Sequence, residues 1–397
     1  MNKKKILSIL GLAAFVVMAD NWVVSPILPT ISKDIGVTVG SAALIITAYM
    51  IPFGLFQPLY GYLGDRFGRV KVINVTMVFF TIATALCAIA SGLTDLAIFR
   101  ALTGMFAGSV MPVSFALIGD VFPLNERQSA IGTFLGIGFL GQGLSTIIGG
   151  TIAYFFNWRG VFAIYAILAV IPTILLFTVS KGIPAVTNKD SKLFAPMGGL
   201  LKNGKSSGIY IIVILEGLLI MGTFSFLGGF IENQYNFNNL IIGLIMSVFG
   251  VMAIAGGRLA AKLSAKIGYK KTVIIGLISA TLASIINVLA ANILPLLIIG
   301  IALLGLGLML AHSTFLTLAS EFAAKSRGVA TSLVAFCYMG GGGIGTAIGS
   351  RILGSNNYVT LFSVYTVGLV LLTLIVLITK KSIVIERAQQ TQQVQQQ

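Results

Sequence analysis

Three charged residues and the only histidine of this sequence lie inside long apolar stretches. Asp20, Arg100, Glu216 and His312 each lie within a stretch of about 20 mostly apolar residues. A charge at the centre of a bilayer costs about 2.5 to 3.5 kcal/mol on insertion scales, so such a residue is expected to have a partner or a function. Desolvation disfavours the ionised form of a carboxyl group, and histidine changes charge near neutral pH. The chemistry that this set predicts is the gain and loss of protons inside a membrane.

Each of these residues also has a structural interpretation. Asp20 would then be permanently paired, or hydrogen-bonded to Asn21 and to neighbouring helices. Glu216 would be a hydrogen-bonded glutamic acid, or it would attract cationic substrates instead of carrying a second proton. Arg100 lies one or two turns into its helix, so its side chain would extend to the outer interface. For His312 we favour a polar residue satisfied between helices over a proton relay.

The elements that must position these residues are membrane-spanning helices. The chain has 397 residues, of which 57% are hydrophobic and 9% charged, and its mean hydropathy is +0.99. A spanning helix needs about 20 mostly apolar residues. Twelve such stretches begin near Ile6, Ser41, Val72, Asp95, Ser129, Gly160, Gly208, Leu240, Thr272, Leu294, Val329 and Tyr358. The sequence therefore predicts an all-α membrane protein with 12 transmembrane helices and no room for a large soluble catalytic domain.

The net charge of +15 follows this topology and does not indicate nucleic-acid binding. With the amino terminus in the cytoplasm, only Lys33, Arg100, Arg159 and Arg351 fall at or near the outer side. Cationic loops are retained in the cytoplasm during insertion. We therefore expect a multi-pass protein of the cell membrane with both termini cytoplasmic.

Other chemistries find little support in the sequence. Cys87 and Cys337 lie in apolar segments and indicate neither a disulfide framework nor a metal site. No phosphate-binding loop appears, so ATP hydrolysis is unsupported. No nucleophile, base and oxyanion group recur at a recognisable spacing, so we expect neither an enzyme nor a cofactor.

A shift of 200 residues aligns many positions without gaps, which indicates two parallel six-helix repeats. The matching pairs are Gly68 and Gly268, Lys71 and Lys271, Phe115 and Phe315, Phe122 and Phe322, Arg127 and Arg327, Gly141 and Gly341, Thr146 and Thr346, Gly149 and Gly349, Asn157 and Asn357, Phe162 and Phe362, and Tyr165 and Tyr365. The predicted domains are a bundle at 1–180, a cytoplasmic linker at 181–207, a bundle at 208–380 and a disordered tail at 381–397. Parallel repeats are one architecture of transporters, with the substrate site between the halves.

The stretch from Gly61 to Lys71 resembles the signature loop of the major facilitator superfamily. Its glycines allow a tight turn, and its charged residues can form charge-assisted bonds across helix ends. The resemblance implies that Asp65 caps a helix of the second half and that Arg69, with Arg66, reaches Asp120. The alternative is a solvated loop that only sets topology. The residues of this predicted latch are Gly61, Asp65, Arg66, Gly68, Arg69 and Asp120. In the second repeat Ala265 replaces the carboxylate, so a weaker latch is expected there.

Three more segments resemble motifs of the same family. Residues 100–108 are similar to the arginine motif of proton-coupled members, which implies a role for Arg100 in proton transfer. Residues 20–29 resemble the first-helix motif of drug:proton antiporters. The fifth span is similar to the glycine-rich motif of exporters, although Ser145 and Thr146 replace the usual Gly-Pro pair, and plain helix packing explains its glycines equally well. The motif residues are Gly141, Ser145, Thr146, Gly149 and Gly150.

These resemblances imply the major facilitator fold and a secondary active carrier that exports a small amphipathic compound in exchange for protons. The expected proton-coupling residues are Asp20, Arg100 and Glu216. The polar residues expected in the substrate cavity are Asn21, Tyr49, Gln57, Gln142 and His312. The expected partners are the substrate, protons and the lipid bilayer, and the carrier is expected to be a monomer. Alternatives are a proton-linked sugar or amino-acid carrier of the same fold, or a transport-inactive receptor or scaffold.

Overall fold

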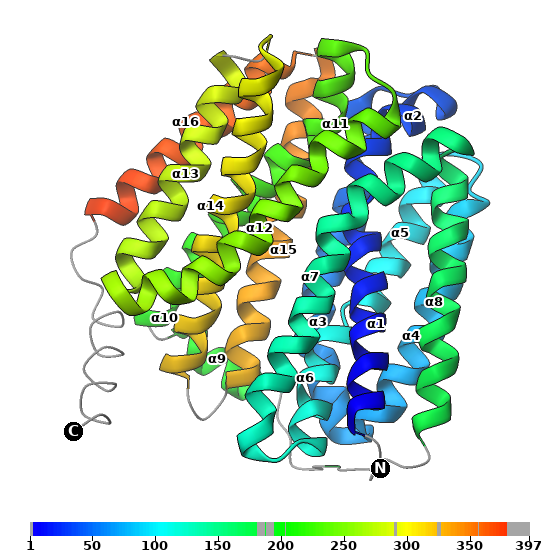
Figure 1. The fold of residues 1–397 in the computed structure, drawn as a ribbon, viewed down its shortest axis with the longest axis vertical. Coiled ribbons are helices and arrows are strands. Elements are labelled where there is room, and N and C mark those ends of the chain that lie inside the picture. The colour runs from blue at the N-terminus through cyan, green and yellow to red at the C-terminus, as the bar shows by residue number, and fades with distance from the viewer. Residues whose placement is uncertain are drawn as a thin grey trace. The chain divides into compact units, whose positions relative to one another are not determined.

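A computed structural model describes residues 3–180, 187, 194–202, 204–289, 292–323, 327–355 and 357–378. Every element in these ranges is a helix (Figure 1). The elements of the first half are α1 (Lys3–Trp22), α2 (Val24–Ile35), α3 (Val39–Phe67), α4 (Arg69–Ala88), α5 (Leu93–Ala107), α6 (Val110–Val121), α7 (Leu124–Phe155) and α8 (Trp158–Ser180). They are followed by α9 (Phe194–Lys202), α10 (Gly204–Glu216), the π-helical segment η1 (Gly217–Met221), α11 (Gly222–Tyr235), α12 (Asn239–Ile267), α13 (Tyr269–Leu289), α14 (Leu294–Phe322), α15 (Arg327–Ile352), the 3₁₀ segment η2 (Leu353–Ser355) and α16 (Tyr358–Ile378).

Twelve of these helices, or runs of consecutive helices, are long and apolar enough to cross a membrane. Two runs count as single spans: α5 with α6 forms Leu93–Val121, and α10, η1 and α11 form Ser207–Tyr235. The short helices α2 and α9 are not among the twelve. The prediction of a 12-helix all-α membrane protein is confirmed.

The chain forms two compact units. Unit 1 comprises Met1–Leu193 and Ser225–Ser247, and unit 2 comprises Phe194–Phe224 and Val248–Gln397. The helices α11 and α12 therefore contribute residues to both units. The domain limits expected from the sequence duplication remain a prediction. Residues 181–186, 188–193 and 203 of the expected linker, and the whole expected tail at 381–397, lie outside the described residues.

The repeat is visible in contacts that each unit makes by itself. In unit 1 the hydroxyl groups of Thr81 and Thr173 lie 3.1 Å apart, and in unit 2 those of Thr281 and Thr373 lie 3.0 Å apart. Each pair joins the third and sixth spans of its half, at positions separated by 200 residues. The turn before the third span also repeats, because Gly68 and Gly268 have φ of +95° and +87°, values that favour glycine.

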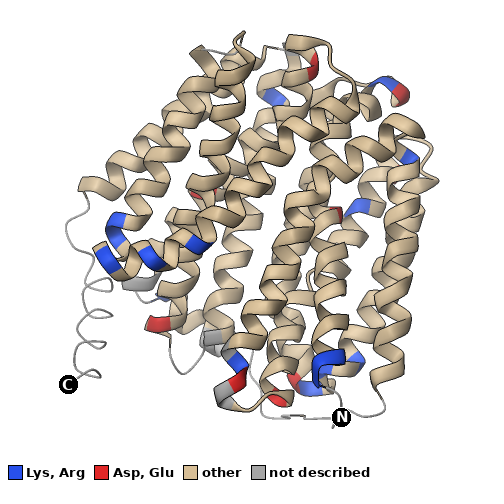
Figure 2. Ribbon diagram, in the orientation of Figure 1, with Lys and Arg blue, Asp and Glu red and all other residues tan. Residues whose placement is uncertain are grey.

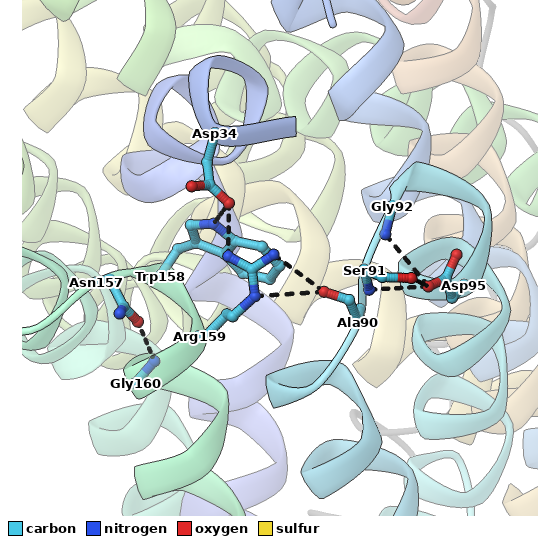
Figure 3. Close-up of polar contacts among 9 residues, drawn as sticks. All are labelled: Asp34, Ala90, Ser91, Gly92, Asp95, Asn157, Trp158, Arg159 and Gly160. Carbon is cyan, nitrogen blue, oxygen red and sulfur yellow. Dashed lines mark hydrogen bonds and ion pairs between the residues drawn. The ribbon is translucent and has the colours of Figure 1, made fainter. Parts of the chain in front are cut away.

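A polar cluster ties three segments together at one end of unit 1 (Figure 3). The carboxylate of Asp34, at the end of α2, accepts hydrogen bonds from Trp158 Nε1 at 3.0 Å and from Arg159 at 2.5 Å, both at the start of α8. Arg159 also donates to the carbonyl of Ala90 at 3.1 and 3.3 Å. In the same loop Asp95 accepts from Ser91 and caps the first turn of α5. The cluster fixes the ends of α2, α4, α5 and α8 near one another.

Candidate functional site

The most deeply buried charges of unit 1 form an ion pair between α1 and α5. Arg100 donates from one guanidinium nitrogen to Asp20 Oδ2 at 2.8 Å and from another to the Asp20 carbonyl at 3.4 Å. The side chains are 1% and 0% exposed, respectively. The Arg100 side chain therefore binds a carboxylate inside unit 1 and does not extend to the outer membrane interface.

Two aromatic rings complete the surroundings of Arg100. Its guanidinium carbon lies 4.2 Å from the ring centroid of Tyr49 on α3 and 5.6 Å from that of Phe162 on α8. Both separations fall within the range of cation–π attraction, which is stronger where water is excluded. The rings thus stabilise the guanidinium in a place where hydration is lost, whether or not Asp20 is ionised.

Close helix contacts hold this pair in place. A Cβ on Gly104, one turn beyond Arg100, would lie 2.2 Å from the Tyr49 carbonyl oxygen, so α5 touches the backbone of α3. A Cβ on Gly141 would lie 2.3 Å from the Phe15 carbonyl oxygen, so α7 touches α1 in the same way. Small residues permit such approaches between membrane helices. The helices that carry Asp20 and Tyr49 are therefore fixed by backbone contact with their neighbours.

The ion pair retains unused hydrogen-bonding capacity. Asp20 Oδ1, Arg100 Nε and the Tyr49 hydroxyl are buried and have no hydrogen-bond partner in the described part of the chain. A buried unpaired polar atom costs roughly 1 to 3 kcal/mol. Asp20 therefore has one oxygen held by Arg100 and one oxygen without a hydrogen-bond partner in the described residues.

A second buried acid–base pair lies in unit 2. Glu216 Oε2, at the end of α10, contacts His312 Nδ1 on α14 at 3.2 Å. The His312 ring packs against the Tyr338 ring of α15 in a tilted arrangement, with the ring centroids 4.2 Å apart and the ring planes at 42°. Sequence reasoning did not identify Tyr338, because it lies in the glycine-rich segment and corresponds to Gly138 in the first half.

The predicted latch residues lie where α3 meets α4. Arg69 donates to Asp65 Oδ1 at 2.9 Å, forms an ion pair with Asp120 of α6, and donates to the Ala116 carbonyl at 3.3 Å. Arg66 instead donates to the hydroxyl of Tyr62. A single arginine thus connects both carboxylates. The expected contact of Asp65 with the second half stays a prediction, as does the function of the latch.

The glycine-rich motif of α7 makes close backbone contacts. An added Cβ would meet Val23 at 2.1 Å from Gly149, and the Asn239 carbonyl at 2.3 Å from Gly150. Ser145 turns its hydroxyl onto the Gln142 carbonyl at 2.8 Å, and Thr146 is buried. Within unit 1, α7 therefore packs tightly on α12 and on the junction of α1 with α2.

The other residues expected in a substrate cavity are placed individually. Asn21 follows Asp20 at the end of α1, and Gln57 and Gln142 are buried on α3 and α7. Of the five, Tyr49 contacts the Arg100 pair and His312 belongs to the pair in unit 2. Among the residues that the structure describes, no group of three or more potential metal ligands occurs.

Sequence reasoning also missed a set of contacts that join α2 to α11 and α12 within unit 1. Ser25 donates to the Ser225 carbonyl at 3.2 Å, Thr30 donates to Asn239 at 2.9 Å, and Lys33 pairs with Glu232. Lys33 and Glu232 carry opposite charges and are 199 positions apart, close to the repeat shift of 200, which could have suggested their pairing. No local pattern in the sequence indicates the other two contacts. These contacts join the first repeat to residues of α11 and α12.

A family model described as Major Facilitator Superfamily matches residues 10–346. The uncharacterized MFS-type transporter YceJ of Bacillus subtilis (strain 168) is 28% identical over 268 residues, which are 66% of this chain and 68% of that protein. Multidrug resistance protein 3 of the same organism is 33% identical over 158 residues, which are 39% of this chain and 31% of that protein. The match thus spans about a third of the length of that multidrug relative.

Solved structures share the fold. The nucleoside transporter NupG has a TM-score of 0.78 at 14% sequence identity, with 96% of this chain and 100% of that chain covered. A D-xylose-proton symporter has a TM-score of 0.74 at 17% identity, with 94% and 96% covered.

Proposed function

Because the chain belongs to the Major Facilitator Superfamily, whose model matches most of its length, we propose that it is a proton-coupled exporter of a small amphipathic compound. The similarity to multidrug transporters at 33% identity supports this class of substrate. The carrier works as a monomer in the cell membrane and needs no cofactor. The proton gradient drives it, since each inward proton contributes about 2.3 kcal/mol per 100 mV of membrane potential.

The observation that carries the proposal is the buried pair of Asp20 and Arg100. An ionised Asp20 neutralises Arg100, whereas a protonated Asp20 leaves the guanidinium charge to Tyr49 and Phe162 alone. One proton therefore changes the net charge at the contact between α1 and α5. Substrate binding and proton binding compete through this charge, which couples the two fluxes.

The charge distribution of unit 1 supports the orientation of the carrier. Figure 2 shows Lys and Arg gathered around the end of unit 1 where the N terminus lies. This end includes Lys3 and the junction of α3 with α4, which carries Arg66, Arg69 and Lys71. By the positive-inside rule this end faces the cytoplasm. An even number of spans returns the chain to the side on which it begins, so with twelve spans the C terminus lies in the cytoplasm as well.

The contacts of α2 with α11 support alternating access. Ser25 with Ser225 and Lys33 with Glu232 join the two repeats at the end that this orientation places outside. A Cβ on Gly228 would lie 2.1 Å from the Ser25 carbonyl oxygen, so the helices meet at their backbones. Within unit 1 these contacts hold α2 against α11, and in the proposed cycle the release of substrate to the outside requires that they separate.

The test begins with a toxicity panel in an efflux-deficient host that expresses the wild type, Asp20→Asn or Glu126→Gln. Glu126 pairs with Lys3 at the surface and serves as the control. A protective compound is then added to acid-loaded everted vesicles. Antiport predicts that the compound releases protons from wild-type and Glu126→Gln vesicles, and that Asp20→Asn abolishes the release.

Other results would reject the proposal. Uptake of the compound together with protons would instead indicate an importer of the same fold. If Asp20→Asn protected the host as well as the wild type does, the Asp20 pair would have no part in proton coupling. If neither the wild type nor any variant protected the host against any compound, a receptor or scaffold would be favoured.

A further inference from the structure

The acid–base pair of unit 2 is not a duplicate of the pair in unit 1. Under the shift of 200 residues, each half has apolar or small residues where the other half has its ionisable pair. The counterparts of Asp20 and Arg100 are Ile220 and Gly300, and the counterparts of Glu216 and His312 are Val16 and Pro112. Each half therefore carries one pair at a position of its own, which indicates separate roles.

The geometry of Glu216 fits a group that exchanges protons through His312. Glu216 is 0% exposed, and its Oε1 has no hydrogen-bond partner in the described part of the chain. His312 contacts the other oxygen at 3.2 Å, and its own side chain is 13% exposed. Among the described contacts of Glu216, the His312 imidazole is thus the group that lies between the buried carboxyl and more accessible surroundings.

Tight packing holds the carboxyl against this imidazole. The π-helical segment η1 follows Glu216 directly, and π-helical turns frequently occur at functional sites. A Cβ on Gly217 would lie 2.1 Å from the Tyr338 carbonyl oxygen, so η1 touches the backbone of α15. The Tyr338 ring in turn packs against the His312 ring, and the buried Tyr338 hydroxyl has no hydrogen-bond partner in the described residues. The relative positions of acid, imidazole and phenol are therefore set by backbone contact.

We propose that Glu216 and His312 form a second proton-binding site, in which His312 passes the proton to Glu216. A proton adds to Nε2 of a neutral His312 that carries its hydrogen on Nδ1. The Nδ1–H bond then breaks as an O–H bond forms on Glu216 Oε2, which leaves a neutral imidazole and a neutral carboxyl. Release reverses these steps. If the protein is the proton-coupled exporter proposed above, on which this inference rests, the consequence of the second site is that one additional proton is carried per substrate molecule.

The other titratable groups near this pair are accounted for. The elements packed on α10 and η1 are α9, α14, α15 and α16. The titratable side chains described on these elements and on α10 are Lys202, Tyr210, His312, Glu321, Cys337, Tyr338, Arg351, Tyr358 and Tyr365. Glu321 accepts a hydrogen bond from Tyr269, Arg351 is exposed, and Tyr358 stacks on Phe362. Tyr210 and Tyr365 donate their hydroxyls to backbone carbonyls, and Lys202 is exposed. In the described residues, His312 is therefore the sole group that forms an ion pair with Glu216.

Infrared titration of the purified full-length protein tests the site without any substrate. A protonated carboxyl in an apolar site has a C=O stretching band that an ionised carboxylate lacks. The expected result is a band that disappears as pH rises, that is absent from Glu216→Gln, and that persists in the surface control Glu126→Gln. A Glu216 band of constant height at every pH would show a permanently neutral structural acid, and absence of any such band would show a permanently ionised one; either result overturns the proposal.

The relay is tested with His312→Gln, which keeps a polar side chain but cannot pass a proton between two ring nitrogens. After a pH jump the Glu216 band of this variant should respond about a hundredfold more slowly, the scale of a typical general acid–base contribution. Tyr338→Phe keeps the ring and should retain the wild-type rate. An unchanged rate in His312→Gln would overturn the relay.

Transport links the site to coupling and separates it from the Asp20 pair. With a compound that the wild type exports, Glu216→Gln should carry one proton fewer per substrate in proteoliposomes, and its transport should depend less on membrane potential. An unchanged ratio would overturn the additional proton. Because the infrared titration needs no transported compound, it decides the existence of the site even where the proposed export function fails.

Discussion

Gly104 lies so close to Tyr49 that a Cβ on the glycine would stand 2.2 Å from the tyrosine carbonyl oxygen. Gly104→Ala must therefore push α5 away from α3, because the obstructing atom belongs to the backbone. We expect a loss of about 1 to 3 kcal/mol of stability, typical of overpacking, and a large loss of transport because Arg100 is one turn away. Thermal unfolding in detergent and vesicle transport measure the two effects.

Gly136→Ala is the matched control for this change. Gly136 lies in helix α7, and a Cβ there would meet nothing within 4 Å. Alanine is favoured over glycine in helices by about 1 kcal/mol, so this variant should be as stable as the wild type or slightly more stable. Equal effects of the two substitutions would contradict the role assigned to the contact between α3 and α5.

The ion pair of Arg100 with Asp20 makes a second prediction, on stability alone. Removal of one partner from a buried pair costs about 3 to 5 kcal/mol, because it leaves a buried charge without compensation, whereas replacement of both partners is often nearly neutral. Asp20→Asn should therefore lower the unfolding temperature, and Asp20→Asn with Arg100→Gln should recover most of the loss. The surface pair of Lys3 and Glu126 should contribute less than about 1 kcal/mol in the same double-mutant cycle.

An additive result would contradict this account. If the double variant lost as much stability as the sum of the single variants, Arg100 would be held by Tyr49 and Phe162 with no contribution from Asp20. The cycle thus separates the ion pair from the cation–π contacts.

The twelve spans and the repeat were predictable because both depend on local composition. Apolar stretches of about 20 residues identify spans one at a time, and a fixed shift identifies duplication. The contact of Arg69 with Asp120 was expected from the family resemblance, and the structure places the two residues together. The spans and the repeat need no knowledge of how helices pack, and the family resemblance supplied the one contact between helices.

The side-chain partners of the buried residues were not predictable in the same way. The sequence gives no distance between Asp20 and Arg100, which are 80 positions apart, and it left an interfacial position open for Arg100. Tyr338 was missed because a tyrosine among glycines has no pattern that identifies it as the ring in contact with His312. Pairing of this kind depends on helix rotation and close approach, which glycines such as Gly104 and Gly217 determine through backbone contact.

The cluster around Asp34 predicts a dependence of stability on pH. The hydrogen bond from Arg159, followed by that from Trp158, lowers the pKa of Asp34 below its ordinary value of 3.8. A carboxyl whose pKa is lowered by folding stabilises the folded state above its unfolded pKa, and this stabilisation is lost as pH falls through the folded pKa. Asp34→Asn should therefore be less stable than the wild type near neutral pH, and the difference should shrink below about pH 4.

Thermal unfolding of both proteins across this pH range measures the effect. The effect should be small because the Asp34 side chain is largely exposed and its pair with Arg159 is screened by water. Lys33→Gln, which alters the neighbouring charge but not the carboxyl, should keep the wild-type acid dependence. A constant difference between wild type and Asp34→Asn at every pH would contradict the assignment.

Arg69 makes the last prediction, because it bonds to both Asp65 and Asp120 while Arg66 bonds to Tyr62. These bonds are partly exposed, so we expect them to stabilise this conformation by about 1 to 2 kcal/mol, which corresponds to about a tenfold shift between conformations. Arg69→Ala should therefore increase hydrogen–deuterium exchange at the junction of α3 with α4 and reduce transport. Arg66→Ala removes the same charge from the same loop and serves as the control. If both variants exchanged at the same rate, the loop would act through its charge alone, and the latch would have no part in the transport cycle.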